Sequence, residues 1–313
     1  MTALSLALVL VSLLLPFAVA PLARRVLDRL APAHALWVLT ASALVLAASC
    51  VAGLGTLVLT GLLKLPLFAA LGELVRPLRT ASNLLVLPVA AVAAGALTLS
   101  VCAIGRSALH QLGAFRTARA QAASRPAAGD LCVVESPYPD AYALPGRPHR
   151  IVVTTAMLRS LGAAEREVLF AHERAHIRAG HHYFLAVAEL AAHCHPALRA
   201  VRTDVRFAAE RAADEAAAVV VGDRRLTARA IALAALAGHD TASVRPAFAP
   251  AATTGPVPRR VSALLTPRTV RPRASRAIAL ALALGSLLSA GTAATAVLGV
   301  HHQVEVAQGE ERR

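Results

Sequence analysis

Two histidines four residues apart, His172 and His176, are the side chains of this sequence best suited to metal chemistry. They lie in the run Ala163–Ala179, which is rich in good helix formers and is followed by Gly180, a residue type that often ends helices. Four residues advance a helix by about 6 Å and about 400° of rotation, so both imidazoles leave the same face. The spacing therefore predicts a helix that presents two rings to one cation.

Glu173 follows the first of these histidines and completes a His-Glu-x-x-His motif. Two neutral imidazoles and a carboxylate suit zinc in tetrahedral geometry, and zinc lowers the pKa of bound water to about 7. Glu173 is then placed to take a proton from metal-bound water as a general base. The structural alternative is two solvent-facing histidines on an amphipathic helix.

A zinc site of this kind needs a third protein ligand, and Glu210 is the candidate. It lies in the run Val205–Ala218, which is helical in composition, and Asp214 shares its face at four-residue spacing. Asp214 can accept the second ring proton of a ligand histidine and so set the tautomer of that ring. Without the histidine motif, both carboxylates would be interpreted as residues on a solvent-exposed face of the helix.

The composition indicates a membrane protein. The 313 residues are 57% hydrophobic with a mean hydropathy of +0.59, which exceeds the apolar share of an ordinary soluble domain. The formal net charge of +14 comes with only 4% aromatic residues and no legible nucleic-acid-binding motif, so no direct nucleic-acid partner is expected. The basic residues are better explained as loops that orient membrane helices.

Four apolar stretches are long enough to cross a bilayer as helices: residues 3–21, 35–62, 82–104 and 277–300. The first stretch could instead be a secretory signal, because Ala18–Ala20 imitates a cleavage site. No Lys or Arg precedes it, however, so it is interpreted as a retained span.

The distribution of arginines predicts the orientation of the spans in the cell membrane. Cytoplasmic loops of membrane proteins carry an excess of Lys and Arg. Three basic groups lie on the cytoplasmic side if the N-terminus is outside, whereas the basic loop between the second and third spans would then lie outside, against the rule. The protein is therefore expected to be multi-pass, with a cytoplasmic catalytic segment and both termini outside. The three groups are Arg24, Arg25 and Arg29; Arg106, Arg116 and Arg119; and Arg268, Arg271, Arg273 and Arg276, against Lys64, Arg76 and Arg79.

These features predict a mostly α membrane protein with four transmembrane helices and an inserted α+β, zincin-like metallopeptidase domain. The expected divisions are a membrane region of three helices at 1–105, a cytoplasmic zinc peptidase domain at 106–275, a transmembrane helix at 276–300 and a short external tail at 301–313.

Inside the inserted segment, Leu131–Val134 and Ile151–Val153 are strand-like, and Ala141–Leu144 is a candidate edge strand for pairing with extended substrate. An ordinary edge strand is about as good a reading. The apolar piece Tyr183–Leu198 is too short to span and predicts a core or interfacial helix that ends at Pro196. Residues 241–258 are loop-like.

Several polar residues receive no site role. The further histidines are not assigned to a metal, and the basic stretch Arg259–Arg276 is interpreted as an orientation signal and headgroup contact. The histidines concerned are His181, His182, His193 and His195.

The sequence resembles the integral-membrane zinc peptidases that include the BlaR/MecR-type antirepressors and, more distantly, the Ste/Htp-type enzymes. The matching residues are Ala141–Gly146, Ile151–Thr154, His172–His176 and Glu210–Asp214, within residues 130 to 265. The resemblance implies that His172, His176 and Glu210 bind one zinc per chain, that Glu173 is the general base and that Asp214 supports the ligands. A penicillin-sensor domain of the β-lactam-sensing members is not expected here.

The expected function is a zinc endopeptidase that cleaves a cytoplasmic or membrane-proximal protein by attack of zinc-bound water. By resemblance, the first candidate substrate is a repressor of the BlaI/MecI type, and the role would be signalling. Two alternatives are a broad-specificity membrane quality-control peptidase and a catalytically silent zinc-binding scaffold. The presence of Glu173 argues against the scaffold, since a structural site needs no base. The oligomeric state is not predicted.

Overall fold

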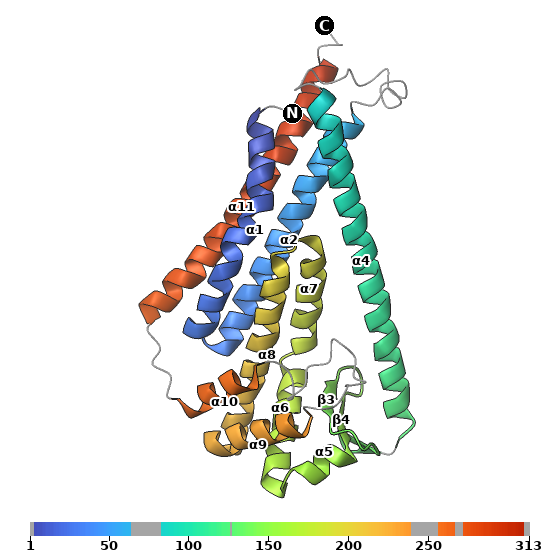
Figure 1. The fold of residues 1–313 in the computed structure, drawn as a ribbon, viewed down its shortest axis with the longest axis vertical. Coiled ribbons are helices and arrows are strands. Elements are labelled where there is room, and N and C mark those ends of the chain that lie inside the picture. Colours follow the sequence, from blue (N-terminus) through green and yellow to red (C-terminus); the bar gives the residue numbers. More distant parts are fainter. Residues whose placement is uncertain (1–2, 64–82, 126, 239–255, 267–271, 310–313) are drawn as a thin grey trace.

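The computed structural model describes residues 3–63, 83–125, 127–238, 256–266 and 272–309. Four long helices dominate it: α1 (Ala3–Arg29), α2 (Pro32–Leu62), α4 (Asn83–Ala123) and α11 (Pro272–Gly309). Each contains a segment long and apolar enough to cross a membrane, as predicted. Figure 1 shows α1, α2 and α11 side by side, with the start of α1 and the end of α11 at the same end of the bundle.

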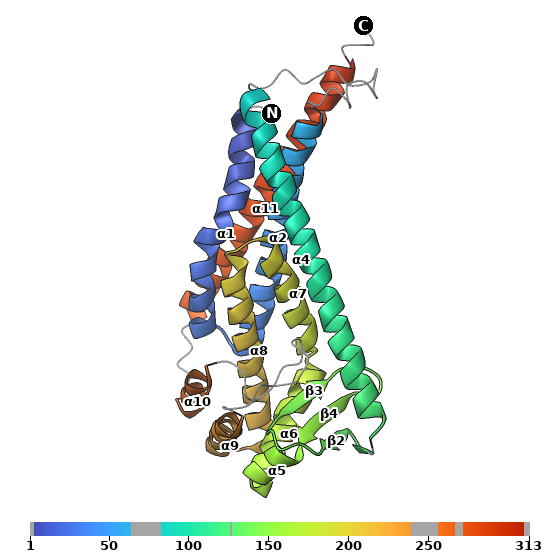
Figure 2. The same cartoon turned by 45° about the vertical axis from the view of Figure 1, so that its right-hand side comes forward.

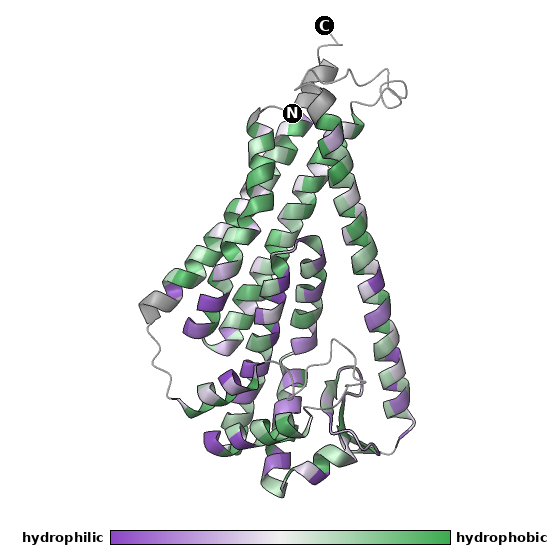
Figure 3. Cartoon of the chain, in the orientation of Figure 1, coloured by the Kyte–Doolittle hydropathy of each residue, from purple (hydrophilic) through white to green (hydrophobic). Residues whose placement is uncertain are grey.

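All four helices are longer than the predicted spans, and two of them cross the predicted domain boundaries. α4 continues without a break through the expected boundary at residue 105 and ends at Ala123, and α11 extends past residue 300 to Gly309. The lower half of α4 carries the polar residues that hydropathy alone separated from its apolar half (Figure 3). A helix can run from lipid into water without changing its backbone, so a shift in composition marks the boundary of the bilayer and not the end of the element.

The remaining elements form an α+β part at one end of the bundle. Its four-stranded sheet has the order β1-β2-β4-β3, in which β2 and β4 are parallel and the other pairs are antiparallel. The strands are β1 (Ala127–Ala128), β2 (Leu131–Val134), β3 (Ala141–Leu144) and β4 (Arg150–Thr154). The predicted strands are confirmed, and β3 lies at an edge. β-branched residues of β4 fill both faces of this central strand, which is buried from Ile151 to Thr154.

Among the described residues, six shorter helices complete this part: α5 (Thr155–Ser160), α6 (Ala163–Arg178), α7 (His181–Cys194), α8 (Leu198–Val221), α9 (Arg224–Ala237) and α10 (Val257–Leu265). The helix predicted to end at Pro196 is α7, which ends two residues earlier at Cys194. Of the expected loop at 241–258, residues 241–255 lie outside the described residues, and α10 begins at Val257.

The α+β part is not packed as a separate body. Figure 2 shows α7 and α8 rising beside α1 and α2. One hydrophobic cluster joins these four helices and α11, including Leu39 of α2, Ala188 of α7 and Val205 of α8. A second cluster packs Ala118 and Ala122 of α4 against the sheet. The long helices thus pack against α8 and the sheet and fix the position at which α6 meets α8.

Candidate metal centre

α6 has the extent that its sequence predicts. It ends at Arg178 with Ala179 as its C-terminal cap, and Gly180 follows with a φ of 63°, the left-handed conformation that glycine adopts without strain. The reversal turns the chain directly into α7. His172, Glu173 and His176 lie on the buried face of α6, with 1%, 0% and 1% of their surface exposed. The solvent-facing alternative for the two histidines is therefore wrong.

α8 supplies the two carboxylates. The predicted helix is confirmed and is longer than the predicted run, and Glu210 and Asp214 lie on its buried face against α6. Three alanines of α8, Ala209, Ala213 and Ala217, are fully buried, and such small side chains allow neighbouring helices to approach closely.

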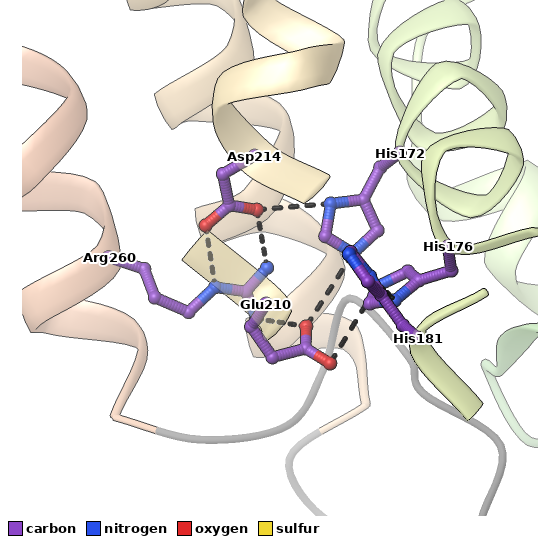
Figure 4. Close-up of polar contacts among 6 residues, drawn as sticks. All are labelled: His172, His176, His181, Glu210, Asp214 and Arg260. Atoms are coloured by element: carbon purple, nitrogen blue, oxygen red, sulfur yellow. Dashed lines mark hydrogen bonds and ion pairs between the residues drawn. The ribbon is translucent and has the colours of Figure 1, made fainter. Parts of the chain in front are cut away.

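Three side chains lie together as a possible metal-binding group: His172, His176 and Glu210. The two Nε2 atoms are 3.1 Å apart, and the Glu210 oxygens lie 3.5 Å from Nε2 of His172 and 3.8 Å from Nε2 of His176 (Figure 4). Two ligands about 2.0–2.1 Å from a tetrahedral zinc are themselves about 3.3–3.4 Å apart. The donor types and their spacing therefore fit zinc.

Asp214 lies behind this group and contacts His172. Nδ1 of His172 lies 3.0 Å from Oδ1 of Asp214, which directs Nε2 towards the other donors. Burial acts to lower the pKa of His172, but the contacts with Asp214 and Glu210 raise it to about 9. In the metal-free protein this ring therefore holds a proton, which a metal must displace to bind.

His181 contacts the Nδ1 atom of His176 and so orients that ring, a role that the sequence did not reveal. Its Nδ1 lies 2.8 Å from Nδ1 of His176, and the ring is buried. Burial and the neighbouring histidines lower the pKa of His176 well below its usual value, and burial lowers that of His181 to about 4. When Nδ1–H of neutral His176 donates to Nδ1 of neutral His181, Nε2 of His176 is left with a free lone pair.

A comparison with known families adds to this geometry. Residues 108–201 match the model of Peptidase family M48, a family of zinc metallopeptidases. This part of the chain is therefore similar to an M48 peptidase domain. The match includes His172, Glu173 and His176 and ends before Glu210 and Asp214. No curated protein and no solved structure matches the chain.

The M48 match also stops before a residue that the sequence analysis misassigned. Arg260 of α10 belongs to the basic stretch interpreted as headgroup contact, yet its side chain is 0% exposed. It donates hydrogen bonds to both oxygens of Asp214, at 2.8 and 2.6 Å, and lies 3.0 Å from Oε2 of Glu210 (Figure 4). A guanidinium presents planar paired donors that suit a carboxylate. Arg260 is therefore part of the candidate metal centre.

The buried charges of the candidate metal centre also fit a divalent cation. Glu173, Glu210 and Asp214 are three buried carboxylates, and Arg260 is one buried guanidinium. Burial acts to lower the pKa of Arg260, but Asp214, Glu210 and Glu173 together raise it above its usual value. Buried charge is costly unless it is compensated. With neutral histidines the excess is two negative charges, which one zinc ion would balance.

Proposed function

We propose that this protein is a zinc-dependent membrane endopeptidase whose metal is held by His172, His176 and Glu210. The observation that carries the proposal is the position of Glu173, a completely buried carboxylate on the same helix as two histidines whose Nε2 atoms face each other at 3.1 Å. A purely structural zinc site has no use for such a carboxylate.

In the proposed reaction, bound zinc would polarise the scissile carbonyl and lower the pKa of water to about 7. Glu173 accepts the proton of the attacking water at its carboxylate and then delivers it to the amine that leaves. Asp214 would keep Nε2 of His172 directed at the metal, and Arg260 keeps Asp214 ionised and lies 3.0 Å from Oε2 of Glu210. Because the three ligands are at most 3% exposed, the site must open to admit a peptide.

The edge strand β3 is the proposed platform for substrate. Within the described part of the chain, β3 pairs only with β4, and it packs against α6, which carries the histidines. An extended peptide can add to such an edge by main-chain hydrogen bonds. The substrate is thus proposed to be a protein segment in extended conformation.

The proposed location of cleavage follows from the positive-inside rule, which places the catalytic segment in the cytoplasm and both chain ends outside. The resemblance to the BlaR/MecR-type antirepressors makes a BlaI/MecI-type repressor the first substrate to test. Reporter fusions after Arg125 and at Arg313 should report opposite compartments. Finding both fusions on the same side would contradict the four-span topology.

The decisive experiment is Glu173→Gln, which preserves side-chain shape but removes the proton acceptor. We expect zinc content of about one per chain and unchanged thermal stability, with cleavage of a co-expressed repressor or of a generic unfolded protein lost. Glu167→Gln, on the exposed face of the same helix, is the matched control and should cleave normally. Retained cleavage in Glu173→Gln with zinc bound would show that another group is the base. Cleavage of the generic protein with no preference for the repressor would favour the quality-control role.

A further inference from the structure

A cavity of about 750 Å³ lies beside the metal centre, between α2, α7, the end of α6 and the connection from β3 to β4. It contains none of the three proposed zinc ligands. Its size is that of a small-molecule site. Its lining has two chemically different walls, which together indicate what it binds.

The first wall is apolar and follows a membrane-spanning helix. It includes Trp37, Ala41 and Leu44 of α2, together with Phe184 and Val187 of α7. Because α2 begins at Pro32, these α2 residues lie about 7–18 Å along its axis. This wall therefore extends from the end of the helix into the part of the bundle that would lie in lipid.

The second wall is basic and belongs to the peptidase side. Arg147, His149, Arg178 and His182 line the cavity, and among its described lining residues there is no Asp or Glu. Arg147 and Arg178 are exposed, and in the described ranges no carboxylate forms an ion pair with either guanidinium. The connection that carries Arg147 is held by Arg119 of α4, which donates hydrogen bonds to the carbonyl oxygens of Pro145, Arg147 and Pro148.

Thr40 adds an independent observation. Its side chain lines the same cavity and is 7% exposed, and its Oγ1 has no hydrogen-bond partner among the described residues. A buried hydroxyl without a partner is uncommon and costs free energy. Because Oγ1 is closed off in this conformation, an oxygen atom of a bound molecule would satisfy it once the side chain turns towards the cavity.

We propose that this cavity binds one anionic phospholipid from the leaflet next to the peptidase domain. The phosphate lies against Arg147 and Arg178, the acyl chains follow the apolar wall of α2 and α7, and Thr40 donates a hydrogen bond to a phosphate or ester oxygen. Trp37, which is 67% exposed, lies where aromatic residues mark the membrane interface. The combination of an apolar wall at membrane depth and a cationic wall at its edge matches a lipid and not a soluble anion.

The position of the site links the lipid to the peptidase. Ile177–Gly180 form part of the cavity wall, and this segment joins His176 to His181. A lipid packed there braces the corner that holds both rings. This consequence rests on the proposed peptidase function, whereas the binding itself does not.

The test uses Trp37, the single tryptophan of the sequence, as a built-in probe. The full chain is placed in phosphatidylcholine nanodiscs that contain a small fraction of brominated phosphatidylglycerol or, in parallel, brominated phosphatidylcholine. We expect the anionic lipid to occupy the site on the order of tenfold more than the neutral lipid, and so to quench Trp37 more strongly. Arg147→Gln/Arg178→Gln should abolish that excess.

The matched control is Arg116→Gln/Arg199→Gln, which removes the same charge from exposed positions outside the cavity and should retain the excess quenching. Equal quenching by the two lipids in the wild type would overturn the proposal, as would an excess that survives Arg147→Gln/Arg178→Gln. Shielding of Trp37 by an added apolar transmembrane peptide, without a lipid preference, would assign the cavity to a protein segment instead. The readout is fluorescence, so the lipid-binding proposal is tested independently of peptidase activity.

Discussion

Nδ1 of His172 lies 3.0 Å from Oδ1 of Asp214, while Arg260 donates a hydrogen bond to each oxygen of the same carboxylate. Burial acts to raise the pKa of Asp214, but the charge and hydrogen bonds of Arg260, together with His172, lower it to about 2. Asp214 therefore stays ionised at physiological pH. One carboxylate thus connects a proposed zinc ligand on α6 with a guanidinium on α10.

Asp214→Asn should weaken zinc binding by about 10- to 100-fold, the usual cost of losing a carboxylate behind a ligand histidine. The amide can still accept one hydrogen bond, but it brings no negative charge to His172 or Arg260. Zinc affinity is measured by competition with a chelator. Glu215→Gln is the matched control, because Glu215 is the next residue of α8 and pairs with Arg224 outside the centre. Equal zinc affinity in the two variants would contradict this role.

Arg260→Met should lower the free energy of unfolding by about 3–5 kcal/mol, because it leaves Asp214 and Glu210 buried without their cation. Arg259→Met, the adjacent residue, should cost about 1 kcal/mol or less, because Arg259 pairs with Asp28 at an exposed position. Denaturant unfolding in detergent compares the two. Adding Asp214→Asn to Arg260→Met should restore part of the loss, since it removes one of the stranded charges.

The sequence predicts those features of the centre that depend on local spacing. His172, Glu173 and His176 lie on one helix, so helical periodicity alone places them on one face. Glu210 could be proposed only by a further argument: two histidines leave zinc without a third protein ligand, so a carboxylate is needed from another helix. In the structure, α8 places Glu210 beside His172 and His176. Strands β2 and β4 were legible because apolar, β-branched residues dominate their short runs.

Arg260 and His181 could not be found in this way, because their roles depend on tertiary contacts. Arg260 is 46 residues from Asp214, and an arginine in a basic stretch ordinarily reads as solvent-exposed. His181 follows the end of α6, and only the left-handed turn at Gly180 returns its ring to His176. The close packing of α7 and α8 against the membrane helices could not be predicted from the sequence either. An apolar helix that is shorter than a bilayer has several possible packing partners.

The ion pair between Arg174 and Asp130 should make a small contribution to the free energy of unfolding, and this contribution should be lost in acid. Arg174, inside the histidine motif, contacts both Asp130 oxygens at 2.7 and 2.8 Å and so ties α6 to the turn before β2. Its hydrogen bond lowers the pKa of Asp130 below the usual value of an aspartate. The folded state thus binds the proton less readily, so the contribution is present above pH 3.8 and is lost as pH falls through the folded pKa.

Asp130→Asn should therefore lower stability by about 1 kcal/mol or less at pH 7, because Arg174 is 38% exposed and solvent screens the pair. The difference from wild type should shrink in acid. Unfolding midpoints at pH 7 and at about pH 3 measure this. A difference that is constant over the range would mean that the pair does not account for the effect of the substitution.

His181→Ala should lower zinc affinity by about tenfold while leaving the fold intact, because His176 then loses the partner that orients its ring. The cavity left by the ring is partly compensated by water, which can bond to Nδ1 of His176 but does not hold it as rigidly. His182→Ala is the matched control: it removes the neighbouring ring, which is only half-buried and makes its aromatic contact with Tyr183. Chelator competition on both variants, with thermal unfolding of the zinc-free proteins, separates ligand orientation from general destabilisation. If both variants bind zinc equally well, the contact between His181 and His176 is packing alone. If His181→Ala loses affinity and His181→Asn, which can still hydrogen-bond, recovers part of it, the ring is a positioning residue for the ligand.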